Sequence, residues 1–221
     1  METSKRVTLT FDNGPDPEVT PFVLEVLARH GIKVTFFVIG EKLRDSARRR
    51  LCEIAHGDGH WIGNHTFNHL TPLGLSRYRY AHRLEIARTQ ELIGELAHPL
   101  KLFRPFGGGG HLNKSLLNAR CLDYLVEEKF TCVLWNSVPR DWENPEGWVD
   151  EAVRQSRNLA WPLVVLHDLQ TEAMSQLEVY ITRMKDEGAT FVQGFPPDSV
   201  PIREGKIILP IEDYVSNFRS T

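Results

Sequence analysis

Short hydrophobic runs alternate along the chain with longer segments in which hydrophobic residues recur with the spacing of one helix face. The short runs predict β-strands, and the longer segments predict amphipathic helices between them. The predicted strands cover residues 6–11, 33–39, 60–64, 100–103, 131–135, 163–166 and 190–193, and the predicted helices cover residues 19–30, 41–55, 76–96, 114–129, 147–158 and 171–187. This order is typical of parallel βα units, so an α/β fold is expected.

Capping signals mark several ends of the predicted helices. Asp16 and Pro17 precede the first helix as an N-cap and a first-turn proline, and Gly31 follows its last turn. Asn113 stands before the fourth helix and is expected to cap it. These signals support the helical interpretation of the segments that the hydrophobic pattern selects.

A single domain is expected over residues 1–221, because no linker rich in proline, serine or glycine interrupts the alternation. Its core is expected within residues 6–195, and the proline-containing residues 196–221 are expected to form an irregular tail on the outside. Hydrophobic residues make up 41% and charged residues 25% of the sequence, which is typical of a globular protein with a sizeable core.

The net charge and the cysteine content limit which binding partners and which cellular compartment are expected. The formal net charge of −3 gives no reason to expect a nucleic-acid partner. No apolar run has the length of a membrane span and no signal peptide is apparent, so we expect no membrane partner and a cytoplasmic location. The cysteines are scattered and odd in number, which favours reduced thiols over disulfides or a cysteine metal site.

His65 and His69 are the first candidates for chemistry, because they stand four residues apart just after the strand predicted at 60–64. Two imidazoles at this spacing can bind one metal ion, and two surface or half-buried histidines are the alternative. A zincin-type helix would need Glu directly after the first His, where this chain has Thr66. A metal-assisted hydrolase would therefore need a base from elsewhere, and Asp12 is the candidate.

Further polar residues follow other predicted strands, namely Asp12, Arg104, Asp141 and His167. Each has a structural alternative: a turn residue, a surface cation, a member of a salt bridge or a structural histidine. In a parallel barrel, however, the carboxyl ends of the strands meet on one face, where active sites are built. We therefore expect these side chains to meet the histidine pair in one site.

The chemistry of these side chains suggests their roles. Asp12 is the candidate general base, and Asn13 is expected near the metal. The guanidinium fork of Arg104 can hold the Asp12 carboxylate ionised and oriented. The glycines at 107–110, after Phe106, let backbone N–H groups approach a ligand closely, which suits an oxyanion hole. A flexible loop is the alternative.

A second acid–base pair is expected between residues 135–142 and the strand end at His167. Asp141 is expected to orient His167 as the general acid, and Trp142 is expected to form an apolar wall. The alternative is a core Trp135 beside a surface salt bridge. A single His-Asp step after a strand is often structural, so this role depends on the other residues of the site.

The order of these motifs resembles the NodB-type polysaccharide deacetylases, carbohydrate esterase family 4. The resemblance covers residues 6–193 and rests on residues 10–15 (TFDNGP), 65–69 (HTFNH), 103–107 (FRPFG), 140–142 (RDW) and 166–168 (LHD). It implies a deformed (β/α)7-type barrel and hydrolysis of an acetamido (N-acetyl) group on a sugar or oligosaccharide, with release of acetate. It also implies an N-acetylated carbohydrate partner and a divalent metal, Zn²⁺ in first place with Co²⁺ or Ni²⁺ as alternatives.

The resemblance implies that Asp12, His167, Arg104 and Asp141 are catalytic, that Phe106, Gly107, Trp142 and Leu166 bind the substrate, and that His65, His69 and Asn13 hold the metal. Two positions depart from the family pattern. Asn13 stands where the family normally has a second Asp that completes an Asp-His-His site, so weaker metal binding is expected. After Arg104 the family normally has two prolines and an aromatic residue, whereas here one proline precedes Phe106. The oxyanion N–H is therefore that of Phe106 or Gly107.

Three functional hypotheses stay open on the sequence alone. The leading one is a metal-dependent sugar deacetylase. The second is a metal-independent hydrolase of a non-sugar amide on the same fold, which the missing carboxylate at Asn13 favours. The third is a carbohydrate-binding protein that has lost catalysis. Metal analysis separates the first two, and loss of turnover on replacing His167 by alanine excludes the third.

Overall fold

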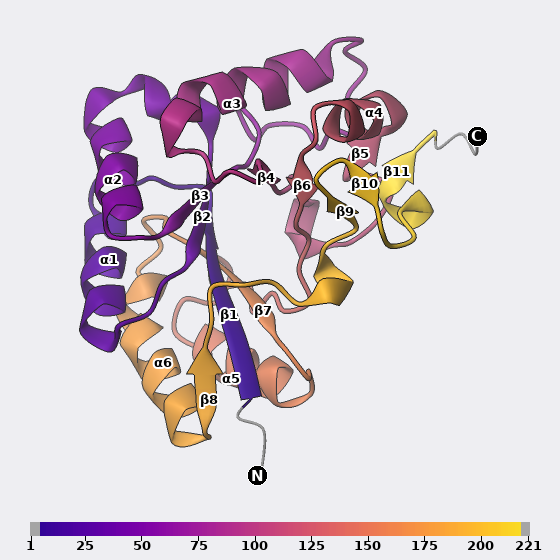
Figure 1. Ribbon diagram of the computed structural model, residues 1–221. Coiled ribbons are helices and arrows are strands. Elements are labelled where there is room, and N and C mark those ends of the chain that lie inside the picture. The colour runs from indigo at the N-terminus through magenta and orange to yellow at the C-terminus, as the bar shows by residue number, and fades with distance from the viewer. Residues whose placement is uncertain (1–4, 218–221) are drawn as a thin grey trace.

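The centre of the molecule is a twisted sheet with helices packed around its outside (Figure 1). This computed structural model describes residues 5–217. The strands are β1 (Lys5–Asp12), β2 (Thr35–Val38), β3 (Trp61–Asn64), β4 (Leu102–Phe103), β5 (Leu117–Asn118), β6 (Thr131–Cys132), β7 (Leu163–His167), β8 (Ala189–Phe191), β9 (Ile202–Arg203), β10 (Lys206–Ile207) and β11 (Val215–Ser216). The main sheet has the order β10-β9-β6-β4-β3-β2-β1-β7, and β8 pairs with the start of β1.

The sheet curls into a deformed barrel, as predicted. β1 pairs in parallel with β2 on one side and with β7 on the other. Beyond β6 the chain continues to Ser137, whose N–H donates to the Leu163 carbonyl at 3.2 Å and whose carbonyl accepts from the Val165 N–H at 3.0 Å. This bridge joins the β6 side of the sheet to β7, so the strands surround a common interior.

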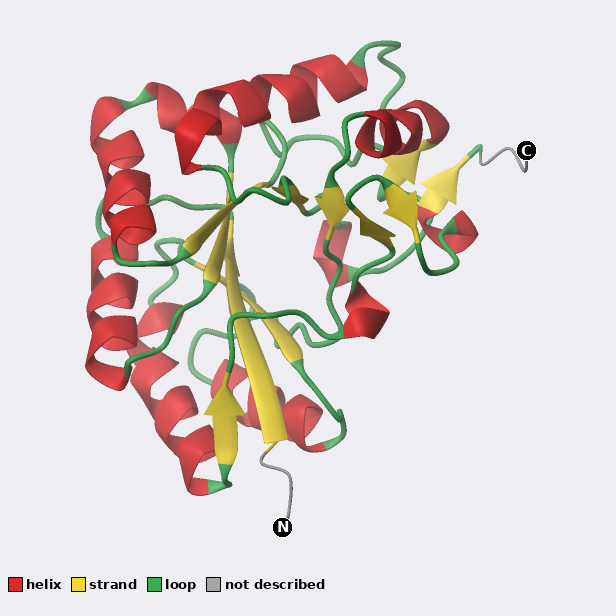
Figure 2. Cartoon of the chain, in the orientation of Figure 1, coloured by secondary structure: helices red, strands yellow, loops and turns green. Residues whose placement is uncertain are grey.

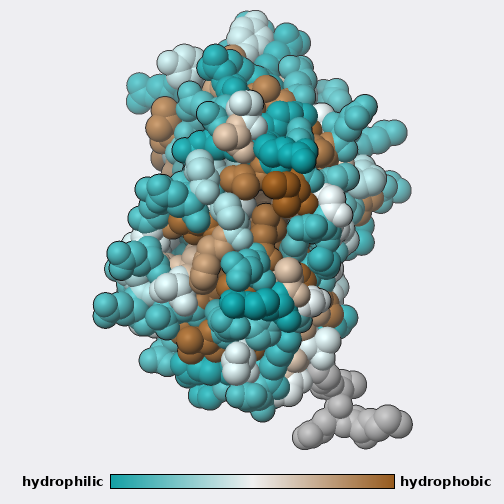
Figure 3. All heavy atoms as spheres, turned by 90° about the vertical axis from the view of Figure 1, so that its left-hand side faces the viewer, coloured by the Kyte–Doolittle hydropathy of each residue, from teal (hydrophilic) through white to brown (hydrophobic). Residues whose placement is uncertain are grey.

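Helices cover the outside of the barrel (Figure 2). The α-helices are α1 (Val19–His30), α2 (Ser46–Gly57), α3 (Arg88–Ile93), α4 (Ala119–Glu127), α5 (Trp148–Arg157) and α6 (Leu177–Asp186). The side that carries α1 and α2 is a mosaic of hydrophilic and hydrophobic residues (Figure 3). Along the described part of the chain, no helix is both long and apolar enough to cross a membrane.

The prediction for α1 is confirmed at both ends. Asp16 Oδ1 accepts hydrogen bonds from the backbone N–H groups of Glu18 at 2.9 Å and Val19 at 3.1 Å, so it satisfies free donors at the helix start. Gly31 ends the helix in a left-handed conformation with φ of 65°, which glycine adopts at little steric cost.

The helix predicted over residues 76–96 begins later than expected. Residues 76–80 lie outside it, and the Ser76 hydroxyl accepts from the Tyr78 N–H at 3.3 Å. This local hydrogen bond competes with helix formation. The helix then passes through the π-helical residues His82–Ala87 into α3. The segment before it is therefore a surface turn.

The helix predicted over residues 114–129 also starts late, at α4. Asn118 caps it by accepting from the Cys121 N–H at 2.9 Å, so the prediction of Asn113 as the cap is wrong. Asn113 instead accepts from the Ser115 N–H at 2.8 Å within a turn. Pairing of β5 with β11 keeps the chain extended up to the actual cap.

The prediction of an irregular tail over residues 196–221 is wrong for part of the described chain, and residues 218–221 lie outside it. β9 pairs antiparallel with β6, and β11 pairs in parallel with β5. Ile202, Ile211 and Val215 are at most 2% exposed and belong to the core that includes β6 and α4. Burial of these side chains stabilises the tail against an edge that would otherwise be open.

Alternation along β1 determines which side chains reach the interior. Leu9 and Phe11 belong to the outer core that α1 and α6 complete. Thr10 and Asp12 lie on the opposite face of the strand, because successive side chains alternate. The interior beneath the strand ends is filled by Phe37, Leu102, Val133 and Leu163.

Candidate active site

A cavity of about 260 Å³ opens where β1, β3, β4 and β7 end. Predicted residues from each of these strand ends line it, which is the convergence expected for a parallel barrel, although Arg104, Asp141 and Leu166 are not among them. The cavity is lined by Asp12, Asn13, His65, His69, Pro105, Phe106, Gly107, Gly109, Gly110, Trp135, Val138, Trp142, Val165, His167 and Leu169.

Asp12 is a buried carboxylate with an arginine tether. Its Oδ1 accepts from Arg104 Nη1 at 2.8 Å, and its Oδ2 lies 3.6 Å from His65 Nε2. Burial is the largest single influence and raises the pKa of Asp12, but Arg104 together with His65 and His167 outweighs it and holds the pKa below its usual value. The side chain is therefore ionised at neutral pH, with one oxygen fixed and the other facing the histidine.

Arg104 is held on every side, because its buried donors need partners. The side chain is fully buried, and its Nη1 also donates to Thr10 Oγ1 at 2.6 Å. Its Nε and Nη2 donate to the Val133 and Leu134 carbonyls, both at 3.2 Å. The guanidinium lies 4.1 Å from the ring centroid of Phe37. These contacts hold the Arg104 guanidinium in one position, between the interior of the barrel and the Asp12 carboxylate.

The histidine pair has the protonation state that a metal ligand needs. The Arg104 carbonyl can only accept, so the 2.9 Å contact from His65 Nδ1 fixes the proton there and leaves a lone pair on Nε2. The His69 ring lies 4.9 Å from the His65 ring and 3.7 Å from that of Phe106. Burial lowers the pKa of both histidines, that of His69 to about 3. Both imidazoles are neutral.

Asn13 supplies a third polar atom. Its backbone is left-handed, with φ of 75°, and its Oδ1 is buried with no hydrogen-bond partner among the described residues. Such an atom costs free energy unless a ligand satisfies it. Within residues 5–217, no group of three or more His, Cys, Asp or Glu side chains could hold a metal, which agrees with an amide at this position. Two imidazoles and an amide oxygen fit a borderline divalent ion.

Asp168 supports the Asn13 loop from behind, a role that the sequence analysis did not assign. A Cβ at Gly14 would lie 2.1 Å from Asp168 Oδ2, so only glycine lets the loop pack this closely. The same oxygen accepts from Thr20 Oγ1, and burial raises the pKa of Asp168 to about 7. The glycine at the loop was the available signal for this contact.

His167 has a carboxylate tether of its own, as predicted. Its Nδ1 donates to Asp141 Oδ1 at 2.8 Å, and its backbone N–H donates to Asp141 Oδ2 at 2.9 Å. Burial lowers the pKa of His167, but the Asp141 carboxylate, with smaller contributions from Asp12 and Asp168, outweighs that effect, so the pKa is raised above its usual value. The Trp142 ring meets the His167 ring edge-on at 4.7 Å and walls the cavity beside it.

The glycine run packs tightly against the cavity wall rather than forming a loose loop. A Cβ at Gly107 would lie 2.6 Å from the Trp135 ring, and one at Gly110 would lie 2.9 Å from Val138. Trp135 Nε1 donates to the Gly110 carbonyl at 2.9 Å. Absence of side chains therefore lets the backbone after Phe106 approach the cavity closely.

Leu166, predicted to bind substrate, is fully buried in the outer core and does not line the cavity. Val165 and Leu169 line it instead, together with Trp135 and Val138. Because side chains alternate along β7, the residue two positions before His167 shares its face. That two-residue spacing in the sequence distinguishes Val165 from Leu166.

The site combines an ionised, arginine-tethered carboxylate and a carboxylate-tethered histidine with two neutral imidazoles around one cavity. A base and an acid on one cavity can hydrolyse an amide or ester carbonyl by activating water and protonating the leaving group. The arrangement is of the kind that supports hydrolysis by acid–base catalysis.

Comparison with known proteins identifies the family. Residues 2–126 match the polysaccharide deacetylase model. A peptidoglycan-N-acetylglucosamine deacetylase of Bacillus cereus is 31% identical over 195 residues, covering 85% of each chain. A chitooligosaccharide deacetylase of Rhizobium leguminosarum bv. phaseoli is 35% identical over 164 residues, covering 72% of this chain and 66% of that protein.

A solved structure agrees with both relatives. The crystal structure of the Bc1960 peptidoglycan N-acetylglucosamine deacetylase in complex with 4-naphthalen-1-yl-N-oxidanyl-benzamide has a TM-score of 0.73 and 27% identity, covering 91% of this chain and 90% of that chain. The chain belongs to the polysaccharide deacetylase family, which confirms the resemblance seen in its motifs. It is a hydrolase that acts on carbon–nitrogen bonds other than peptide bonds.

Proposed function

We propose that this protein hydrolyses an acetamido group on a sugar or oligosaccharide and releases acetate, with the help of a divalent metal. The observation that carries the proposal is the meeting of tethered Asp12, tethered His167 and the neutral pair His65 and His69 in one cavity. The named activities of the two relatives support an N-acetylated sugar as the substrate. The cytoplasmic location stays a prediction.

His65, His69 and the Asn13 amide oxygen would hold the metal, and Zn²⁺ suits this set, with Co²⁺ or Ni²⁺ as alternatives. When bound, the ion supplies Lewis-acid chemistry that polarises the amide carbonyl and makes water more acidic. The neutral imidazoles support this role because a ligand must offer a lone pair. The buried, partnerless Asn13 oxygen supports it because the ion would satisfy that acceptor.

Asp12 acts as the general base in this proposal. Arg104 keeps the carboxylate ionised and fixes Oδ1, so Oδ2 is the oxygen that takes a proton from the attacking water. Backbone N–H groups of Phe106 or Gly107 stabilise the developing oxyanion, since both residues line the cavity.

His167 acts as the general acid. Asp141 orients its ring and favours the protonated form, so the imidazolium can protonate the leaving amine. The acetyl methyl group lies against the apolar wall formed by Trp142, Val165 and Leu169. These residues exclude water and fix the acyl group between the base and the acid.

The test is acetate release from N-acetylated chito-oligosaccharides, with O-acetylated xylo-oligosaccharides in parallel and Zn²⁺, Co²⁺ or Ni²⁺ added. We expect acetate from the N-acetylated panel, and loss of turnover in His167→Ala. Turnover that depends on His167 excludes a protein that only binds carbohydrate. No acetate from any N-acetylated sugar with any of the three ions would contradict the proposal.

Asn13→Asp is expected to tighten Zn²⁺ binding more than tenfold, or about 1.4 kcal/mol, because it restores a negative charge beside the two imidazoles. Calorimetric titration of both proteins measures the difference. Asn158→Asp, at the end of α5, adds the same charge on the surface and should leave the affinity unchanged. Equal affinities of wild type and Asn13→Asp would show that Asn13 does not contact the metal.

Asp141→Asn is expected to move the alkaline limb of the pH profile of kcat/KM to lower pH. His167 must be protonated, and loss of the Asp141 carboxylate removes the largest influence that raises its pKa, so burial is opposed only by the weaker effects of Asp12 and Asp168 and the pKa falls. Asp186→Asn, a change on an exposed aspartate, serves as the control. An alkaline limb at the same pH in Asp141→Asn and wild type would rule out His167 as the acid that Asp141 tunes.

A metal-independent amide hydrolase on the same fold is the second candidate, and the neutral side chain of Asn13 favours it. In that case Asp12 and His167 would act alone as base and acid on an amide that needs less activation. Metal analysis of the purified protein separates the two candidates. One equivalent of metal, lost together with activity on replacing His65, excludes the second.

A further inference from the structure

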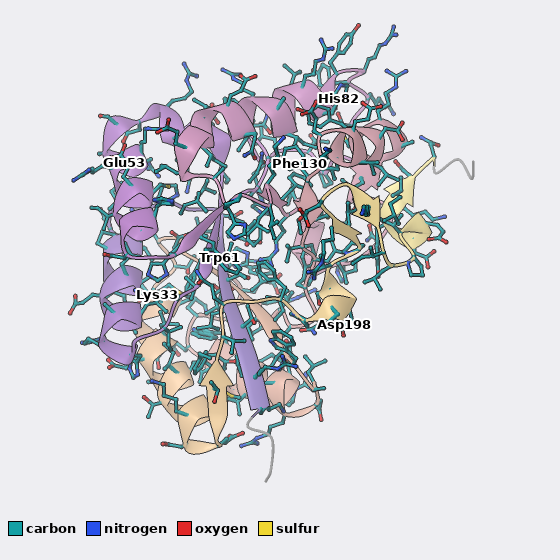
Figure 4. The ribbon with its side chains drawn as sticks, viewed as in Figure 1. Lys33, Glu53, Trp61, His82, Phe130 and Asp198 are labelled. Atoms are coloured by element: carbon teal, nitrogen blue, oxygen red, sulfur yellow. The ribbon has the colours of Figure 1, made fainter. Side chains whose placement is uncertain are left out.

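A second cavity, of about 770 Å³, lies beside the start of α4 and is lined by Arg77, Arg79 and Arg120. We call it the arginine cavity. The turn before the π-helical residues forms one wall, and α4 forms the other. Arg120 Nη1 donates to the Arg79 carbonyl at 3.3 Å, so the two walls are joined. Figure 4 shows the neighbouring His82 between these elements, and its ring lies 5.2 Å from that of Tyr124 on α4.

The guanidinium groups of the arginine cavity form no ion pair with a carboxylate of the described chain. Over the described residues, none of these three arginines has a carboxylate oxygen within the 4.0 Å of an ion pair, although Asp123 also lines the cavity. Some exposed arginines elsewhere are paired with carboxylates, as Arg29 is with Glu178 at 2.9 Å and Arg157 with Glu187 at 2.7 Å. Others, such as Arg44 and Arg203, also lack an ion pair within the described chain, so the distinguishing feature is that three unpaired arginines gather in one cavity. The cavity therefore concentrates positive charge on a chain whose net charge is −3.

Two exposed tyrosines accompany the arginines. Tyr78, which lines the cavity, is 76% exposed, and Tyr80 is 52% exposed. The guanidinium groups of Arg79 and Arg83 lie 5.6 and 5.8 Å from the Tyr80 ring centroid. An aromatic face with a polar edge suits a sugar ring, and an arginine fork suits a carboxylate. This pairing favours an acidic sugar polymer over a bare anion.

The loops that line the arginine cavity also line the catalytic cavity. His69 lies at the start of the first loop and Ser76 at its far end, and a chain of seven residues spans at most about 25 Å. The second loop runs from the glycines after Phe106 to Asn118. The two loops pack together where the Gly74 N–H donates to the Ser115 carbonyl at 2.8 Å. One extended polymer can therefore reach both cavities.

We propose that the arginine cavity binds the carboxylates of an acidic polysaccharide while an acetylated sugar of the same polymer lies in the catalytic cavity. This rests on the proposed function, and it narrows the substrate class to N-acetylated polysaccharides that also carry acid groups. Three charge-assisted contacts give the polymer affinity that a neutral oligosaccharide lacks.

The test compares binding of polygalacturonate to the wild type and to R77Q/R79Q/R120Q at low salt. The triple variant should bind at least tenfold more weakly, and rising salt should weaken the wild type more steeply. R29Q/R154Q/R157Q removes the same charge from paired arginines and should bind within twofold of wild type. Equal weakening in both triple variants, or none in R77Q/R79Q/R120Q, would overturn the proposal. So would tighter binding of double-stranded DNA than of polygalacturonate.

Turnover of a neutral substrate separates this proposal from the proposed function. R77Q/R79Q/R120Q should deacetylate neutral N-acetylated chito-oligosaccharides with wild-type kcat/KM within twofold, which also shows that it folds. If kcat/KM for the neutral substrate fell as much as polygalacturonate binding, the arginine cavity would have no role separate from the catalytic cavity. Polygalacturonate binding requires no turnover, so failure to release acetate would count against the proposed function and leave the binding result intact.

Discussion

Asp12→Asn is expected to lower kcat for amide hydrolysis by about 10²–10⁴-fold, the usual contribution of a general base. The amide keeps the size of the carboxylate but cannot take a proton from water. Arg104 remains buried and loses the charge on its partner, so thermal unfolding is measured alongside the kinetics. Rates are compared at a temperature where the variant is folded.

Asp198→Asn is the matched control, because Asp198 is exposed on the short 3₁₀ helix Pro197–Ser199 and has no assigned role (Figure 4). It makes the same chemical change and should leave kcat unaltered. A kcat for Asp12→Asn within tenfold of wild type would show that another group serves as the base.

Arg104→Met is expected to lower the free energy of unfolding by about 3–5 kcal/mol at neutral pH, because it leaves the buried Asp12 carboxylate without its counter-ion. In the wild type the pKa of Asp12 is lowered on folding, so the pair stabilises the protein above the unfolded pKa of about 3.9. That contribution is lost as pH falls through the folded pKa. In Arg104→Met the main influence that lowers the Asp12 pKa is gone, and burial, which raises it, is opposed only by His65 and His167. The pKa therefore rises, and the deficit should shrink in acid as Asp12 becomes protonated.

Denaturant unfolding at neutral and acidic pH measures this effect. Arg183→Met breaks the exposed pair with Asp150 and should cost under about 1 kcal/mol at either pH. The double variant Arg104→Met with Asp12→Leu removes both charges and should recover part of the lost stability. A deficit for Arg104→Met that matches the Arg183→Met control would mean that the buried pair contributes little.

Local signals predicted the first helix well and the later ones less well. For the helix at residues 19–30, the sequence shows a capping residue, Asp16, and a terminating glycine, Gly31. In the structure Asp16 accepts hydrogen bonds at the helix start and Gly31 ends the helix. Asn113 and Asn118 are equally good caps by residue type, and only tertiary pairing of β5 with β11 selects the second. The pairing of the tail with β6 likewise depends on contacts distant in sequence, which no local pattern shows.

The site residues that could be predicted are those whose role depends on their residue type and on their position at the end of a strand. Asp12 and His167 are the last residues of their strands and His65 directly follows its own, so their meeting followed from the barrel topology. The apolar wall was predicted less well, because Leu166 and Val165 have similar side chains and only strand alternation separates them. The tautomer of His65 and the unpaired Asn13 oxygen could not be predicted, since both depend on atomic contacts.

The central claim is tested most directly by titrating metal-free protein with Zn²⁺ while measuring acetate released from an N-acetylated chito-oligosaccharide. The proposal predicts no acetate without metal, a rise in rate with added Zn²⁺ and saturation at one equivalent per chain. His65→Ala should stay inactive throughout the titration. Full activity of the metal-free protein, or no acetate at any Zn²⁺ concentration, would contradict the assignment of His65, His69 and Asn13 to a catalytic metal.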